Sequence, residues 1–142
     1  MLILFLSVVL AGTFAVLSVL HFYWGIKGSA NGVSVVPVNA EGKLLFAPSR
    51  FDSFMVGIVL MVFFVFVLIK TQWIHFILPL WIMRYGLWFI AALFLLRAIG
   101  DFKYMGFGKK INGTPFARMD TLLYTPLCLI LALSAIVLNL LT

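Results

Sequence analysis

The side chains that can take part in chemistry lie near one end of each apolar segment of this chain. The motif Arg-x-Asp occurs twice, in "PSRFDS" and in "FARMDT", and each copy begins an apolar run. A guanidinium group binds carboxylates and phosphates, and a histidine can accept or donate a proton near neutral pH. We therefore predict a polar site comprising His21, Arg50, Asp52, Arg97, Asp101, Arg118 and Asp120.

Each Arg-x-Asp motif also predicts where a helix begins. The carboxylates of Asp52 and Asp120 are expected to cap unpaired backbone N–H groups at the positive end of the helix dipole. Arg50 and Arg118 lie just outside these positions, from which a long side chain reaches lipid phosphates.

Two interpretations of this polar layer are open. It is either an interfacial layer of ion pairs that fixes helix packing, or a site that binds a lipid headgroup, a small amphipathic or anionic molecule, or a partner subunit. One alternative is a membrane enzyme acting on a lipid-like substrate, with His21 and either Asp101 or Asp120 as acid and base. Another is a small dimeric transporter, although no ionisable residue falls at mid-depth of any apolar segment. No catalytic residue is assigned.

The elements that must position these residues are membrane-spanning helices. Of the 142 residues, 65% are hydrophobic and 10% are charged, against roughly 45–50% and about 25% in soluble proteins. A helix needs about 20 apolar residues to cross a bilayer. The sequence predicts an all-α membrane protein with four such helices, at about 2–24, 51–69, 74–97 and 121–140. The first is expected to be a span rather than a cleaved leader, since no positively charged region precedes it.

Basic residues predict the orientation of these spans. Of the ten Lys and Arg residues, only Lys70 and Arg84 lie away from the first and third connections. The positive-inside rule places those two connections in the cytoplasm and both termini outside. Anionic lipid is the expected partner of the basic and aromatic residues there. The predicted headgroup contacts are Lys103, Lys109, Lys110, Trp24 and Tyr104.

Internal similarity suggests a duplicated unit. The two Arg-x-Asp motifs, together with "AVLSVLH" and "AALFLLR", occur at matching topological positions. We predict two tandem helical hairpins, about 1–70 and 71–142, related by a pseudo-two-fold axis along the membrane normal. The connection 25–49 is expected to form either a small β-hairpin or a flexible linker.

The chain shows no pattern typical of a metal, cofactor or nucleic-acid site. His21 and His75 fall at opposite ends of their spans, and the lone Cys128 is expected to behave as a small hydrophobic residue. We therefore predict no cofactor, no metal and no nucleic-acid partner. Membrane lipid is the expected partner, with a second copy of the chain or a partner membrane subunit as alternatives.

The blocks "LHFYWG", "LLRAIGDFKYMGFGKK" and "TPFARMDTLLYTPLCLILAL" resemble a family of small four-helix bacterial membrane proteins that is catalogued only as a domain of unknown function. The resemblance extends over essentially the whole chain, and 95–128 is its most specific part. It implies a bacterial integral membrane protein and supports four spans. It implies no activity and no binding residues. The expected location is the bacterial cytoplasmic membrane.

Overall fold

Four helical segments long and apolar enough to cross a membrane make up most of the computed structural model, which describes residues 1–28, 36–37, 39–45, 49–100 and 103–142. Within those ranges there is no β-strand, so the prediction of an all-α protein with four spans is confirmed. The fourth segment, Pro115–Leu141, is continuous but contains a π-helical turn. The elements are α1 (Leu2–Lys27), α2 (Arg50–Lys70), α3 (Leu80–Ile99), α4 (Pro115–Met119), η1 (Asp120–Tyr124) and α5 (Thr125–Leu141).

The third span begins at Leu80 and not near residue 74, which corrects the predicted boundary. Pro79 precedes the helix, and a proline disfavours helical backbone in the residue before it. The chain before it turns instead, since the N–H groups of Trp73 and Ile74 both donate to the Leu68 carbonyl, at 2.8 and 3.2 Å. Residues 71–79 therefore form the connection between α2 and α3.

The fourth span begins at Pro115 and not near residue 121. The hydroxyl of Thr114 accepts a hydrogen bond from the Ala117 N–H at 3.0 Å, and Pro115 occupies the first helical position, where a missing N–H costs nothing. This start places Asp120 inside the continuous helical segment and away from its first turn.

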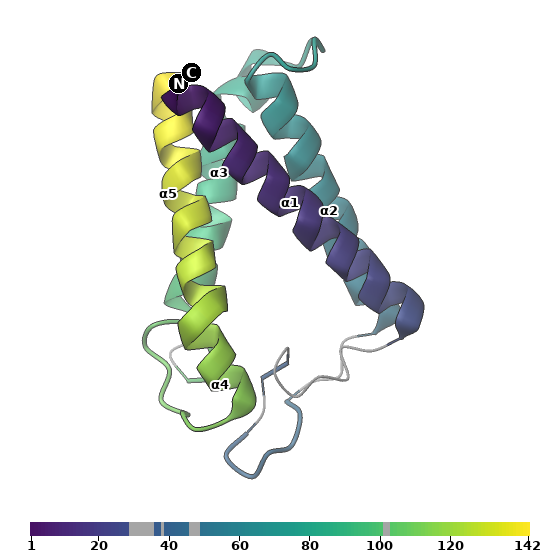
Figure 1. The fold of residues 1–142 in the computed structure, drawn as a ribbon, viewed down its shortest axis with the longest axis vertical. Helices are drawn as coiled ribbons and strands as arrows, with labels where there is room; N and C mark the ends of the chain where they lie inside the picture. The colour runs from purple at the N-terminus through teal and green to yellow at the C-terminus, as the bar shows by residue number, and fades with distance from the viewer. Residues whose placement is uncertain (29–35, 38, 46–48, 101–102) are drawn as a thin grey trace.

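The helices pack as two antiparallel pairs, α1 with α2 and α3 with α5. Figure 1 shows the pairs close together near the chain termini and diverging toward the other end of the molecule. The termini and the α2–α3 connection lie at the close end, which we call the terminal end. The connections after α1 and after α3 lie at the divergent end, which we call the loop end. This pairing is the one that tandem hairpins require, and the duplication itself stays a prediction.

An aromatic contact joins the two pairs, and small residues allow close packing within the first pair. Phe14 of α1 is fully buried, and its ring centroid lies 5.7 Å from that of Phe63 in α2 and 5.6 Å from that of Phe94 in α3. Within the first pair, the Ser18 hydroxyl donates to the Gly57 carbonyl at 2.7 Å. Small residues let transmembrane backbones approach closely enough for such bonds. Along α1, the residues from Leu6 to Phe14 contribute to the buried core, whereas Leu17 and the residues after it that face the other pair line a cavity.

The described part of the connection between α1 and α2 is a tight turn. The Leu45 N–H donates to the Pro37 carbonyl at 3.1 Å, and the Asn39 N–H donates to the Lys43 carbonyl at 2.9 Å. The remainder of the predicted hairpin lies outside the described residues.

Candidate functional site

A buried carboxylate organises the loop end of the α3–α5 pair. The Asp120 side chain is 0% exposed and accepts hydrogen bonds from Arg97 Nη2 at 2.9 Å, the Gly106 N–H at 2.8 Å and Lys109 Nζ at 3.2 Å. The Lys109 side chain is itself only 6% exposed. We call Asp120, Arg97, Lys109 and Gly106 the Asp120 cluster. Its hydrogen bonds hold the connection between α3 and α4 against the helical segment that begins at Pro115.

Two glycines allow that connection to fold back. Gly100 and Gly106 both have positive φ, at 75° and 82°. A Cβ on Gly100 would collide with the Met105 carbonyl, and a Cβ on Gly106 would collide with the Ile99 carbonyl. Only residues without a side chain permit this contact between two backbone segments. The contact places the Gly106 N–H where it meets the Asp120 carboxylate.

The π-helical turn Asp120–Tyr124 follows from the sequence. Pro126 has no N–H, so the usual ladder of helical hydrogen bonds is interrupted at that position. The Thr125 N–H donates to the Asp120 carbonyl, five residues back, and so closes the wider turn. The turn changes the angular position of Asp120 relative to α5, and such turns are frequent at functional sites.

A cavity of about 520 Å³ is lined by residues of both helix pairs, and its residues from α1 follow Phe14 in the direction of the loop end. Its walls are mainly aliphatic and aromatic side chains from all of the spans. The lining residues that carry polar groups are His21, Trp24, Arg97, Tyr124 and Cys128. The lining residues are Leu17, His21, Trp24, Met55, Val56, Val59, Leu60, Phe63, Leu93, Phe94, Arg97, Phe116, Tyr124, Leu127 and Cys128. We call this space the inter-pair cavity.

His21 and Arg97 give the inter-pair cavity its hydrogen-bonding character. His21 Nδ1 lies 2.8 Å from the Leu17 carbonyl, which can only accept, so Nδ1 carries the hydrogen and Nε2 is the acceptor of the neutral ring. Arg97 Nη2 is held by Asp120, whereas Arg97 Nη1 is buried and has no hydrogen-bond partner in the described part of the chain. A buried donor left unpaired costs about 1–3 kcal/mol. The cavity is therefore lined by an imidazole that can accept a hydrogen bond and by a partly exposed guanidinium that Asp120 already engages.

The predicted polar residues do not form one layer. Asp52 lies on the exposed start of α2, where its carboxylate accepts from the Ser49 N–H at 2.8 Å while the Ser49 hydroxyl accepts from the Asp52 N–H at 3.1 Å. This reciprocal pair is a capping box, so the predicted capping role of Asp52 is confirmed. Arg50 lies beside the end of α1, since a Cβ on Gly28 would come within 2.6 Å of its Nε. A cation there opposes the negative end of the α1 dipole.

Asp120 does not cap a helix, which corrects the prediction for the second motif. Thr114 provides the cap, and Asp120 is a buried acceptor of cationic and backbone donors. Arg118 is exposed and forms no ion pair with any described residue. Asp101, expected to face Arg97, lies outside the described residues. The structure thus brings together Arg97 and Asp120 at one end of the inter-pair cavity and places His21 on its wall.

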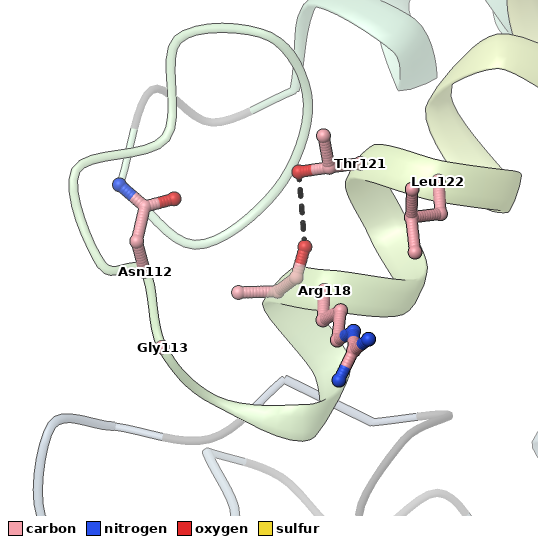
Figure 2. Close-up of a pocket in the computed structure, with 6 residues that line it drawn as sticks. Asn112, Gly113, Arg118, Thr121 and Leu122 are labelled. Atoms are coloured by element: carbon pink, nitrogen blue, oxygen red, sulfur yellow. Dashed lines mark hydrogen bonds between the residues drawn. The ribbon is translucent and has the colours of Figure 1, made fainter.

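A second hollow, of about 460 Å³, lies beside α4 and η1 and is lined by Asn112, Gly113, Ala117, Arg118, Thr121 and Leu122. The Thr121 hydroxyl donates to the Ala117 carbonyl at 3.0 Å, so it is already satisfied. Figure 2 shows that the Asn112 and Arg118 side chains do not point toward one another. The Asn112 and Arg118 side chains of this hollow do not converge, which makes it a weaker candidate than the inter-pair cavity.

The predicted headgroup contacts lie in different surroundings. Lys103 and Lys110 are exposed, and Lys103 Nζ lies 5.1 Å from the Tyr104 ring centroid. Lys109 is buried in the Asp120 cluster, so its ammonium group is engaged there and does not lie at the surface. Trp24 lines the inter-pair cavity, with its ring edge-on to His21 at 5.0 Å between centroids.

Sequence reasoning missed Cys128 and Tyr124 as cavity residues. They are four residues apart on one helix face, and Leu17, His21 and Trp24 repeat the same kind of spacing on α1. That spacing shows that the residues share one face of the helix. It does not show whether the face packs against another helix or lines a cavity.

Comparisons with known proteins agree with a small membrane-protein family. A family model described as "Protein of unknown function (DUF3995)" matches residues 14–135. No match was found among curated proteins or among solved structures.

Proposed function

Because the chain belongs to the DUF3995 family of proteins of unknown function, we propose a function from its geometry: it is a membrane protein that binds an amphipathic molecule in the inter-pair cavity. The apolar part of the ligand lies among the helices, and its polar head lies near His21 and Arg97. Membrane lipid is the source of such a ligand.

The distribution of polar groups in the inter-pair cavity carries this proposal. One part of the cavity wall is apolar and includes Leu60, Phe63 and Phe94. Another part includes the charged side chain of Arg97, which pairs with Asp120. Apolar walls with a few placed polar groups are typical of small-molecule sites. An apolar chain is stabilised by burial against such walls, and a polar head can form a charge-assisted hydrogen bond with the exposed part of the Arg97 guanidinium.

The size of the inter-pair cavity suits one small ligand. Its volume of about 520 Å³ falls within the range of roughly 300–1,000 Å³ that is usual for ligand pockets. Met55, Val56, Val59 and Leu93 line it and are still exposed, so it is open at its side. An amphiphile can therefore enter from the surrounding bilayer without unfolding the helix pairs.

We also propose an orientation in the membrane, with the loop end in the cytoplasm of a bacterial cell and the termini outside. The basic residues concentrated at the loop end support it. An epitope tag after Thr142 is expected to react with antibody in intact spheroplasts, and a tag between residues 110 and 114 only after permeabilisation. The reverse pattern would contradict this orientation. The tandem-hairpin relation of 1–70 and 71–142 belongs to the same proposal and is supported by the pairing of the helices.

The proposed ligand site can be tested through Cys128, the one cysteine of the chain, which lines the inter-pair cavity. Protein in phosphatidylcholine nanodiscs is treated with N-ethylmaleimide, and intact mass spectrometry follows alkylation. A single-chain amphiphile, either hexadecanoate or hexadecanol, is expected to slow alkylation about tenfold at a concentration ten times its Kd, because only the empty cavity reacts.

A matched control uses the same helix. In a Cys128→Ala, Val137→Cys variant, the thiol lies at an exposed position outside the cavity. Its alkylation rate should not change with either amphiphile. If neither compound slows alkylation of Cys128, or if both thiols are slowed equally, the inter-pair cavity is not the binding site.

A further inference from the structure

We infer that the segment from Trp73 to Trp81 is a membrane anchor whose partner is the bilayer surface at the terminal end of the molecule. We call residues 73–81 the interfacial segment. It comprises most of the connection between α2 and α3 together with the first residues of α3, and none of its residues lines the inter-pair cavity. Side-chain exposure, helix length and backbone hydrogen bonding carry the inference.

Large apolar side chains of the interfacial segment are exposed. They are Trp73, Ile74, Phe76, Ile77, Leu80 and Trp81. Ile77 is 97% exposed and Leu80 is 81% exposed, and no formally charged residue lies between Lys70 and Arg84. Exposure of such a surface to water is unfavourable, and a patch of this kind marks contact with a membrane or with another protein.

The exposed surface continues onto α3, which selects lipid as the partner. Trp81, Tyr85 and Trp88 are four and three residues apart, so they lie on one face of the helix, and all three are exposed. A membrane span presents such a face to the bilayer. Trp and Tyr are enriched at membrane–water interfaces, where the rings are shielded and their polar atoms are hydrated. The bilayer that covers this face of α3 therefore also covers the interfacial segment.

Helix length sets the depth of the interfacial segment. The helix α2 has 21 residues and α3 has 20, so each is roughly 30 Å long at about 1.5 Å per residue. That length equals the thickness of the hydrocarbon core, about 30 Å. The two helices therefore cross the core without help from the connection, and the interfacial segment lies at the level of the headgroups.

Backbone hydrogen bonding indicates the same depth. The N–H groups of Trp73 and Ile74 donate to the Leu68 carbonyl, whereas those of residues 75–78 form no backbone hydrogen bond within the described part of the chain. Unpaired backbone groups are not tolerated in contact with hydrocarbon, but water and headgroups satisfy them at the interface. The backbone therefore stays among the headgroups while the Ile77 side chain reaches the acyl chains.

Two cations flank the interfacial segment. Lys70 Nζ donates to the Met83 carbonyl at 2.8 Å, which ties the end of α2 to the start of α3. The exposed Arg84 guanidinium lies 5.7 Å from the ring centroid of Tyr85. The Lys70 bond holds the two ends of the connection together, and Arg84 lies beside the segment, from which a long side chain reaches lipid phosphates.

The experiment measures the depth of residue 77 with a spin label. In a Cys128→Ala background, an Ile77→Cys variant carries a nitroxide label in phosphatidylcholine nanodiscs. Electron paramagnetic resonance measures its collision rates with oxygen, which concentrates among acyl chains, and with nickel ethylenediaminediacetate, which concentrates in water. Because Ile77 is almost fully exposed, the label replaces no packing contact. Two exposed positions calibrate the depth: Val62→Cys in the middle of α2, and Glu41→Cys in the connection between α1 and α2.

We expect the ratio of oxygen to nickel collisions at residue 77 to be several times that at residue 41 and lower than that at residue 62, as a position at the headgroup level requires. A ratio equal to that at residue 41 would place the segment in water, and a ratio equal to that at residue 62 would place it in the hydrocarbon core. Either result overturns the inference. Low collision rates with both reagents would show that a second copy of the chain or another protein covers Ile77, which overturns it as well. None of these outcomes depends on a ligand in the inter-pair cavity, so the inference is tested separately from the proposed function.

Discussion

Asp120→Asn is expected to lower the free energy of unfolding by about 3–5 kcal/mol. The substitution keeps the shape of the side chain but removes the negative charge that holds Arg97 and Lys109. Lys109 is then a buried cation without a counter-charge among its described contacts, and removal of one partner from a buried ion pair is strongly destabilising. Equilibrium unfolding in mixed detergent and SDS micelles, followed by circular dichroism, measures the change.

The first motif provides the matched control for this prediction. Asp52→Asn alters the same residue type in the same Arg-x-Asp context, but Asp52 is exposed and only completes a capping box with Ser49. Its effect on stability should be small, because an Asn side chain also caps a helix. Equal losses from the two substitutions would contradict the distinct roles assigned to Asp52 and Asp120.

Alanine at Gly100 or Gly106 should prevent the connection between α3 and α4 from closing on Asp120. Each glycine has positive φ, which costs a non-glycine residue about 1–3 kcal/mol. In addition, the new Cβ would collide with a backbone carbonyl, of Met105 or of Ile99, which cannot move as a side chain can. We expect each variant to lose more stability than the φ penalty alone. Limited proteolysis between residues 103 and 114 should become faster.

Gly113 separates the two causes of this effect. Its φ is also positive, at 86°, but a Cβ there would meet nothing within 4 Å. Gly113→Ala should therefore show only the conformational penalty, about 1–3 kcal/mol, and little change in proteolysis. If Gly106→Ala were no more damaging than Gly113→Ala, the backbone contact would not be needed for the Asp120 cluster.

The four spans could be predicted from the sequence because each depends on a local property, a run of apolar residues long enough to cross a bilayer. Their ends were less predictable where a single residue decided them. Four of the five residues at 74–78 are apolar, yet Pro79 keeps this stretch outside α3. Thr114 and Pro115 start the last span ahead of its motif. These signals are present in the local sequence, but the spans were predicted mainly from the length of each apolar run.

The two Arg-x-Asp motifs show why the candidate site could not be predicted as well. Ser49 lies immediately before the first motif and makes Asp52 part of a cap, whereas a cap at Thr114 places Asp120 more than a turn inside the helix. The partners of Asp120 then depend on a chain reversal that two glycines make possible. The same Arg-x-Asp motif therefore places one aspartate in an exposed helix cap and the other in a buried ion-pair cluster.

The inter-pair cavity depends on a still more distant relation. Residues of both helix pairs line it, and Figure 1 shows these pairs diverging toward the loop end. No residue spacing within one helix determines that divergence. His21 was predicted as a site residue from its type and from its position at the inner end of the first span. Cys128 was predicted to be an ordinary small hydrophobic residue. Its place in the cavity wall could not be predicted, because the residues that face it come from other spans.

The most direct test of the inter-pair cavity is native mass spectrometry of the protein as purified in mild detergent, with lipid extraction of the same sample. The unmodified chain should carry one additional mass that corresponds to a single-chain amphiphile. Val59→Trp, which fills the cavity, should lose that mass, and Val62→Trp, at an exposed position of the same helix outside the cavity, should keep it. A protein free of any bound mass, or a mass that Val59→Trp retains, would contradict binding in the inter-pair cavity.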